Sequence, residues 1–210
     1  MILVKYLFIS RWRAVPFGLA LLMAVFAGGG CGSKDLAADS TAALGEVMGK
    51  QTAELLGGHG TVVLLVSEAG NEKSEGLAKT IAAFEQALGK SVNVSAVENL
   101  QLRTLPGLPP FSPQKFSEVL QKYATADALV SFVMLPVLTT EEVRQLPAPR
   151  PKVVLMAGVP SKTLFVQQVV YLAVLPKPGS DSDAKPRTAK AWFDSRYQLI
   201  TPETATALAY

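Results

Sequence analysis

Apolar residues along the chain form runs that alternate with stretches in which apolar and charged residues mix. The run TVVLLVS at 61–67 consists mainly of β-branched residues and leucines, which is typical of a strand buried on both faces of a parallel sheet. Further apolar and alternating patterns predict strands at 91–98, 127–135, 151–158 and 169–178, and an edge strand at 191–200. Strands therefore recur through most of the chain after residue 60.

The stretches between the predicted strands have helical patterns. Between 72 and 89, apolar residues recur at helical spacing with charged residues opposite. Ser112 followed by Pro113 has the N-cap and first-turn chemistry of another helix. Thr139 and Glu142 have the spacing of a capping box and predict a short helix. Further helical segments are predicted at 40–56, 160–168 and 201–208.

This alternation of strands and helices predicts the fold class. Two parallel strands need a crossover between them, and such crossovers are right-handed, so helices come to lie on the faces of the sheet. We therefore expect an α/β fold, a three-layer sandwich with a mostly parallel sheet of Rossmann-like or flavodoxin-like type. The pattern leaves the order of the strands open.

The first 30 residues have a different character. They contain three basic residues, Lys5, Arg11 and Arg13, and no acidic residue, and no charge occurs between Ala14 and Gly30. A basic start, a short apolar middle and small residues at the end predict a signal peptide over 1–30, with a signal helix at its centre. The apolar run is about 14 residues long, which is short for crossing a bilayer core of about 30 Å, so a retained membrane helix is the lesser alternative.

Cys31 is the only cysteine, and it directly follows this segment in the sequence AGGGC. The stretch resembles the lipobox of bacterial lipoproteins, although Gly28 stands where leucine is usual. The resemblance implies cleavage before Cys31 and attachment of lipid, palmitate included, to that residue. It also implies a location in the bacterial cell envelope, and Gly32 is compatible with the outer membrane, facing the periplasm. An ordinary signal peptide followed by an idle cysteine is the alternative.

Removal of the signal changes the charge of the chain. The full sequence has 20 basic and 17 acidic residues, a formal net charge of +3 and a pI of about 9.0. Without residues 1–30 the two kinds are equal in number, so no basic patch argues for nucleic acid. About 180 residues remain, enough for one domain. We expect a tether at 31–41 and a single α/β domain at 42–210.

Motifs for catalysis, cofactors and metals are missing from the sequence. His59 is the only histidine, and its GGHG turn precedes the first strand, at the edge opposite the expected crevice. No GxGxxG follows a strand, and no P-loop is present. One histidine and one cysteine do not make a metal cluster. The sequence therefore predicts a protein that is not an enzyme and has no cofactor.

Polar residues follow several of the predicted strands. In parallel α/β sheets, ligands bind beyond the carboxyl ends of the strands, so these residues should line one rim. The candidate ligand-binding residues are Ser67, Glu68, Asn71, Glu98, Asn99, Thr139 and Ser161. Together with helix N-termini they would suit a small polar or anionic group. The alternative is that they act only as caps and turn formers.

The alternating pattern over 60–175, including ADALVSFVML, resembles one lobe of the type I periplasmic sugar- and amino-acid-binding proteins. Those proteins close two lobes on a ligand, whereas about 180 residues supply one. We therefore expect a non-catalytic envelope lipoprotein that acts as a scaffold or docking component for a protein partner. Docking would use an exposed edge, the proline-rich loop at 99–111, or the aromatic stretch around Trp192 and Phe193. The alternative function is a single-lobe binding module for a small polar solute.

Overall fold

The computed structural model describes residues 40–67, 74–100, 111–179 and 186–206. All of these residues belong to the unit Asp35–Tyr210. The predictions for the signal peptide, for Cys31, and for Glu68 and Asn71 lie outside the described residues. So does the predicted tether, apart from its last two residues, which belong to the first described helix.

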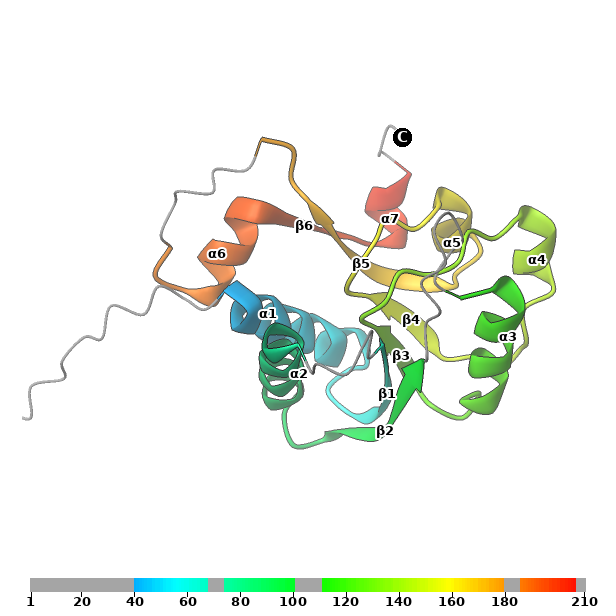
Figure 1. Cartoon of the computed structure of the whole chain (residues 1–210), viewed down its shortest axis with the longest axis horizontal. Coiled ribbons are helices and arrows are strands. Elements are labelled where there is room, and N and C mark those ends of the chain that lie inside the picture. Colours follow the sequence, from blue (N-terminus) through cyan, green and yellow to red (C-terminus); the bar gives the residue numbers. More distant parts are fainter. Residues whose placement is uncertain (1–39, 68–73, 101–110, 180–185, 207–210) are drawn as a thin grey trace, which may run out of the picture. The chain divides into compact units, whose positions relative to one another are not determined.

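A six-stranded sheet forms the centre of the described fold (Figure 1). Its strands are β1 (Gly60–Ser67), β2 (Val92–Leu100), β3 (Ala128–Ser131), β4 (Lys152–Leu155), β5 (Val170–Pro176) and β6 (Tyr197–Ile200). Their order is β2-β1-β3-β4-β5-β6, and only β6 runs antiparallel to its neighbour. The predicted α/β fold with a mostly parallel sheet is confirmed, and the first five strands have the flavodoxin-like order.

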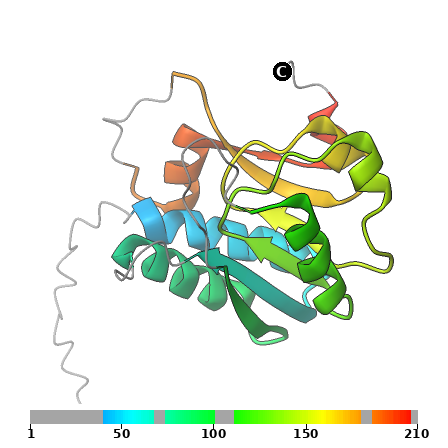
Figure 2. The ribbon, with the colours of Figure 1, turned by 45° about the vertical axis from the view of Figure 1, so that its right-hand side comes forward.

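Helices cover both faces of this sheet (Figure 2). One face carries α1 (Ser40–Leu55), α2 (Glu75–Leu88) and α6 (Ala189–Arg196). The other carries α3 (Pro113–Lys122), α4 (Thr140–Arg144), α5 (Lys162–Val166) and α7 (Pro202–Ala205). Each helical layer buries its own apolar cluster against the sheet, so the predicted three-layer sandwich is also confirmed.

Strand β1 shows why the sequence forms this sheet. Val62, Leu64 and Val66 belong to the cluster under α1, α2 and α6, while Val63 and Leu65 belong to the cluster on the opposite face. These five side chains are at most 6% exposed. Because each buried aliphatic side chain stabilises the fold by about 1.5–3 kcal/mol, a run without polar residues is what a central parallel strand requires.

The order of the strands places a topological switch point between β1 and β3. The chain leaves β1 through α2 on one face to reach β2, and it leaves β3 through α4 on the other face to reach β4. The two crossovers therefore diverge at the carboxyl ends of β1 and β3. In open parallel sheets this is where a crevice forms and where ligands bind.

The predicted strand at 191–200 is wrong over most of its length. Residues 189–196 form α6, and only the last four residues form β6. Thr188 explains the difference, because its Oγ1 accepts a hydrogen bond from Ala191 N at 3.2 Å and caps the helix. Trp192 and Phe193 are 7% and 2% exposed, so these rings are part of the core and are not offered to a partner.

Candidate functional site

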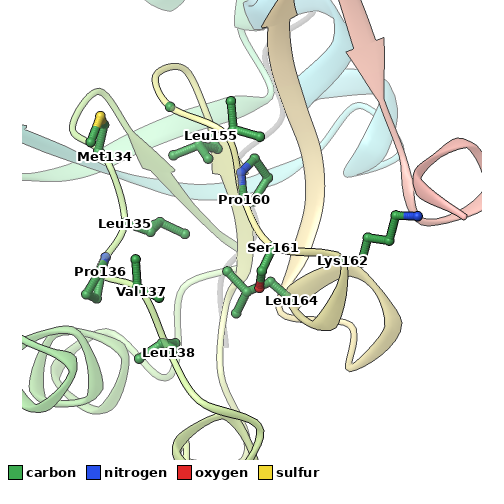
Figure 3. A pocket seen from close by; sticks show the side chains of 12 residues that line it. Met134, Leu135, Pro136, Val137, Leu138, Leu155, Pro160, Ser161, Lys162 and Leu164 are labelled. Carbon is green, nitrogen blue, oxygen red and sulfur yellow. The ribbon is translucent and has the colours of Figure 1, made fainter. Parts of the chain in front are cut away.

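A pocket of about 560 Å³ lies at the carboxyl ends of β3 and β4 (Figure 3). Two connections form its walls, the β3–α4 segment 134–138 and the β4–α5 segment 158–162. These segments are neighbours because β3 pairs with β4 in parallel, so their carboxyl ends meet at the same edge of the sheet. The pocket therefore lies on the predicted rim, one strand away from the switch point.

Two local features shape the wall formed by the β3–α4 segment. Ser131, the last residue of β3, is fully buried, and its hydroxyl donates a hydrogen bond of 2.7 Å to the Val133 carbonyl. This turn ends the strand earlier than the sequence pattern predicts. Apolar residues then continue in the connection rather than in the strand, and Leu135, Val137 and Leu138 face the pocket.

The mouth of the pocket is apolar and open to solvent. Val137 is 86% exposed, Val159 is 62% exposed and Met134 is 53% exposed. All three line the pocket, so three of the five large exposed apolar side chains of the described residues gather there. A grouped apolar surface of this kind is a candidate binding surface.

Ser161 is the predicted site residue that lines this pocket. It occupies the N-cap position of α5, but its side chain makes no capping hydrogen bond. Its hydroxyl lies beside Leu164, on the side of the pocket opposite the 134–138 segment (Figure 3). The neighbouring Lys162 also lines the pocket, and its side chain extends away from that segment.

Thr139 serves as a cap rather than as part of the pocket wall. Thr139 Oγ1 accepts a hydrogen bond from Glu142 N at 3.2 Å, and the Glu142 carboxylate accepts one from Thr139 N at 2.7 Å. The predicted capping box is therefore confirmed. The hydrogen bonds from the Thr139 backbone and hydroxyl hold the pKa of Glu142 below its usual range. The cap fixes the point where the connection after β3 enters α4.

Glu98 lies within β2 and contacts α3 instead of the pocket. Lys122 Nζ and the Tyr123 hydroxyl each donate to Glu98 Oε2 at 2.5 Å. The hydrogen bond from Lys122, followed by that from Tyr123, lowers the pKa of Glu98. Burial, and then the neighbouring Glu98, raises the pKa of Tyr123. The carboxylate thus joins the edge strand to the end of α3.

Ser67 and Asn99 lie close together at the carboxyl ends of β1 and β2. In the parallel register, Ser67 is opposite Leu100 and Asn99 is opposite Val66. The Ser67 hydroxyl is buried and has no hydrogen-bond partner among the residues that the structure describes. Because register partners point to the same face, Asn99 shares the face of Val66, and Ser67 shares the opposite face with Leu100. The two predicted polar residues therefore form no common polar site, and Ser161 lies in the pocket two strands further along.

The pocket residues Met134, Val137 and Val159 were missed by the sequence reasoning. The polar residues that follow the strands predict a polar rim, whereas the pocket is mainly apolar. A signal was present in the run FVMLPVL, where apolar residues continue past the length of an average strand and through Pro136. Val133 and Leu138 of this run pack in the core, whereas Met134 and Val137 are exposed and form a candidate binding surface.

His59 lies away from the pocket, in the turn that precedes β1 at the opposite end of the sheet. It is exposed, and its Nδ1 is 3.1 Å from the Gly57 carbonyl oxygen. Over the described ranges, no group of three histidine, cysteine, aspartate or glutamate side chains is placed to hold a metal ion. Within the same ranges, every helix is too short or too polar to cross a membrane.

The sequence matches no protein-family model and no curated protein, but its structure is similar to solved structures. One is AraP, an arabinose-binding protein from Geobacillus stearothermophilus, with 17% identity and a TM-score of 0.53, covering 81% of this chain and 63% of that one. Another is an ABC transporter solute-binding protein from Burkholderia graminis C4D1M in complex with D-arabinose, with 10% identity, a TM-score of 0.53, and coverage of 81% and 62%.

A third similar structure is the XylFII–LytSN complex, with 12% identity, a TM-score of 0.50, and coverage of 78% of this chain and 60% of that one. The chain thus spans less than two thirds of the length of these proteins. The likeness establishes a shared α/β fold with solute-binding proteins. Two of the three similar structures are named for the binding of a small sugar, and none of the three is named as an enzyme.

Proposed function

We propose that this chain is an exported, non-catalytic binding module that holds one small solute in the pocket between the β3–α4 and β4–α5 connections. The observation that carries the proposal is the position of the pocket, at the carboxyl ends of parallel strands and beside the switch point. Its volume of about 560 Å³ is within the range of small-molecule sites. The similarity to sugar-binding proteins supports solute binding ahead of a purely scaffolding role.

A thermal-unfolding screen of the purified protein tests this function. A ligand that binds only the folded state raises its stability, by about 2.7 kcal/mol at a concentration of 100 times Kd. We expect V137W to abolish the shift, because an indole at this exposed rim position fills the pocket. The control is V166W, since Val166 is 67% exposed on α5 and is not part of the pocket wall. A shift that is equal in both variants would place the site elsewhere.

The export part of the proposal depends on Cys31 and the lipobox-like AGGGC before it. The mature protein begins at Cys31, carries lipid there, and faces the periplasm from the outer membrane. We expect mass spectrometry to find an acylated amino-terminal cysteine on protein from the membrane fraction, and C31S to move the protein to the soluble fraction. An unmodified amino-terminal methionine on protein from the cytoplasm would contradict both export and anchoring.

A second candidate function, docking to an envelope protein, is favoured by strand β2. This strand is nine residues long, contains no lysine or proline, and within the described sheet pairs only with β1. Val97 on this strand is 55% exposed. Such an edge can accept an extended segment of a partner by strand addition. One similar structure, the XylFII–LytSN complex, contains a second protein.

Co-purification with the membrane-anchored protein tests this second function. A partner identified by mass spectrometry should be lost from V97K, because a lysine on the free edge opposes strand addition. It should be retained by V166K, which places the same charge on α5. Retention of the partner by both variants would remove β2 as the docking edge.

A further inference from the structure

We infer that the solute is a small aliphatic molecule with a single polar end, rather than a sugar. This inference rests on the proposed function and concerns the same pocket. It follows from the chemistry of the 12 lining residues, all of which are described. Only Ser161 and Lys162 among them have polar side chains, and the wall contains no carboxylate, no carboxamide and no aromatic ring.

A sugar is a poor match for such a wall. Its hydroxyl groups point in all directions, and each one that loses water without gaining a partner costs about 1–3 kcal/mol. Three of the 12 lining residues have no free backbone donor to replace water. Pro136 and Pro160 have no N–H group, and the N–H of Leu164 already donates to the Ser161 carbonyl at 3.0 Å.

An aliphatic solute matches the same wall well. Leu138, Leu155 and Leu164 are 6%, 1% and 2% exposed, so they form a floor that is already packed in place. The exposed side chains at the mouth are the surface that a ligand would cover, and covering apolar surface is favourable by about 25 cal/mol per Å². Met134 belongs to this mouth, and its flexible thioether chain adapts to the shape of a ligand.

The single polar end would lie against Ser161. Its hydroxyl makes no capping bond to α5, and it lies at the end of the pocket wall where the chain enters that helix. A hydroxyl can donate to a carboxylate or accept from an alcohol, so it can serve one polar group of either kind. It cannot serve the several hydroxyl groups of a sugar at once.

Calorimetric titration of the full mature protein distinguishes the two ligand classes. The probes are the alcohols and carboxylates with four, six and eight carbons, together with L-arabinose and D-glucose. We expect affinity to rise about fourfold for each added methylene group until the pocket is filled. S161A should weaken the binding of hexanol and hexanoate about five- to tenfold, because each ligand loses one hydrogen bond. The sugars should give no heat of binding.

Three variants make the outcome decisive. V137W and V159W, which both fill the mouth from exposed positions, should abolish binding, and V166W should retain it. If arabinose or glucose binds and V137W abolishes that binding, the inference of an aliphatic ligand is wrong and the proposed function still holds. Binding of neither class, or binding unchanged in V137W and V159W, would overturn the pocket as the site, and the aliphatic ligand with it.

Discussion

Gly158 lies directly against Met134, across the mouth of the candidate pocket. A Cβ atom placed on Gly158 would be 2.8 Å from Met134 Cγ, closer than two carbon atoms can approach without a shift. Gly158 also has a φ of +86°, which a residue with a side chain rarely adopts. The close approach of the two connections therefore depends on glycine at this position, and it sets the distance between the two pocket walls.

Replacing this glycine tests whether the contact shapes the site. We expect G158A to displace Met134 and to lower ligand affinity, and to cost about 1–2 kcal/mol in the free energy of unfolding from backbone strain. Urea unfolding and ligand titration measure the two effects. The matched control is G58A, because Gly58 has a φ of +79° but a Cβ atom there would meet no neighbouring atom within 4 Å. It should lose stability and keep its affinity. Equal affinity losses in both variants would show that the contact has no special role.

A second prediction concerns the packing of α1 on α2. A Cβ on Gly45 would be 2.1 Å from the Thr80 carbonyl oxygen, and one on Gly49 would be 2.4 Å from the Phe84 carbonyl oxygen. The two helices thus meet backbone to backbone, and G45A or G49A must push them apart. We expect each to destabilise the protein by about 1–3 kcal/mol in urea unfolding.

Gly76 in α2 provides the control for this packing prediction. A Cβ there would be 3.4 Å from Thr41 Cγ2, an ordinary contact, so G76A should be neutral or stabilising by up to about 1 kcal/mol because alanine favours helix. If G45A were as stable as G76A, α1 could move away from α2 without lowering the free energy of unfolding.

The bond between Asp127 and Thr61 makes stability depend on pH. Asp127 Oδ2 accepts from Thr61 N at 2.8 Å and from Thr61 Oγ1 at 3.0 Å, which lowers the pKa of Asp127. A carboxyl whose folded pKa is below its unfolded value contributes stability that is present above the unfolded pKa, about 3.9, and lost as pH falls through the folded pKa.

Urea unfolding at neutral and acidic pH tests this link between β1 and β3. The wild type should be more stable than D127N at neutral pH, and the difference should shrink below about pH 4. The control D194N removes only an exposed pair with Lys190 and should change stability by less than about 0.5 kcal/mol. A D127N variant as stable as the wild type at neutral pH would contradict the prediction.

Variants of Glu98 and Tyr123 test whether Glu98 stabilises the fold or binds the ligand. Its hydrogen bonds to Lys122 and Tyr123 predict that E98Q and Y123F each lower the free energy of unfolding, with about 1 kcal/mol expected for Y123F. In a double-mutant cycle their effects should be less than additive, because they share one interaction. Ligand affinity should stay unchanged in both. A larger loss of ligand affinity in E98Q than in Y123F would show that Glu98 takes part in ligand binding.

Sequence patterns predicted most of the fold because they report on local geometry. The continuous apolar run of β1, the Ser112–Pro113 start of α3 and the capping box of Thr139 each depend on residues within a few positions of one another. The aromatic residues of 189–196 suit a strand. The segment nevertheless forms a helix, because Thr188 caps its first turn.

The sequence by itself therefore determined the alternation of strands and helices, the faces that they bury, and the end of the sheet where the candidate pocket lies. Only the tertiary structure decided that Glu98 accepts a hydrogen bond from Tyr123 at the end of α3, and that Gly158 packs directly against Met134. It also decided that Val137 and Val159 line the same apolar pocket. The physical reason is the separation along the chain of the residues that interact. Periodicity and capping act within a turn or two of chain, whereas these contacts join segments about 20 or more residues apart and depend on strand order and register.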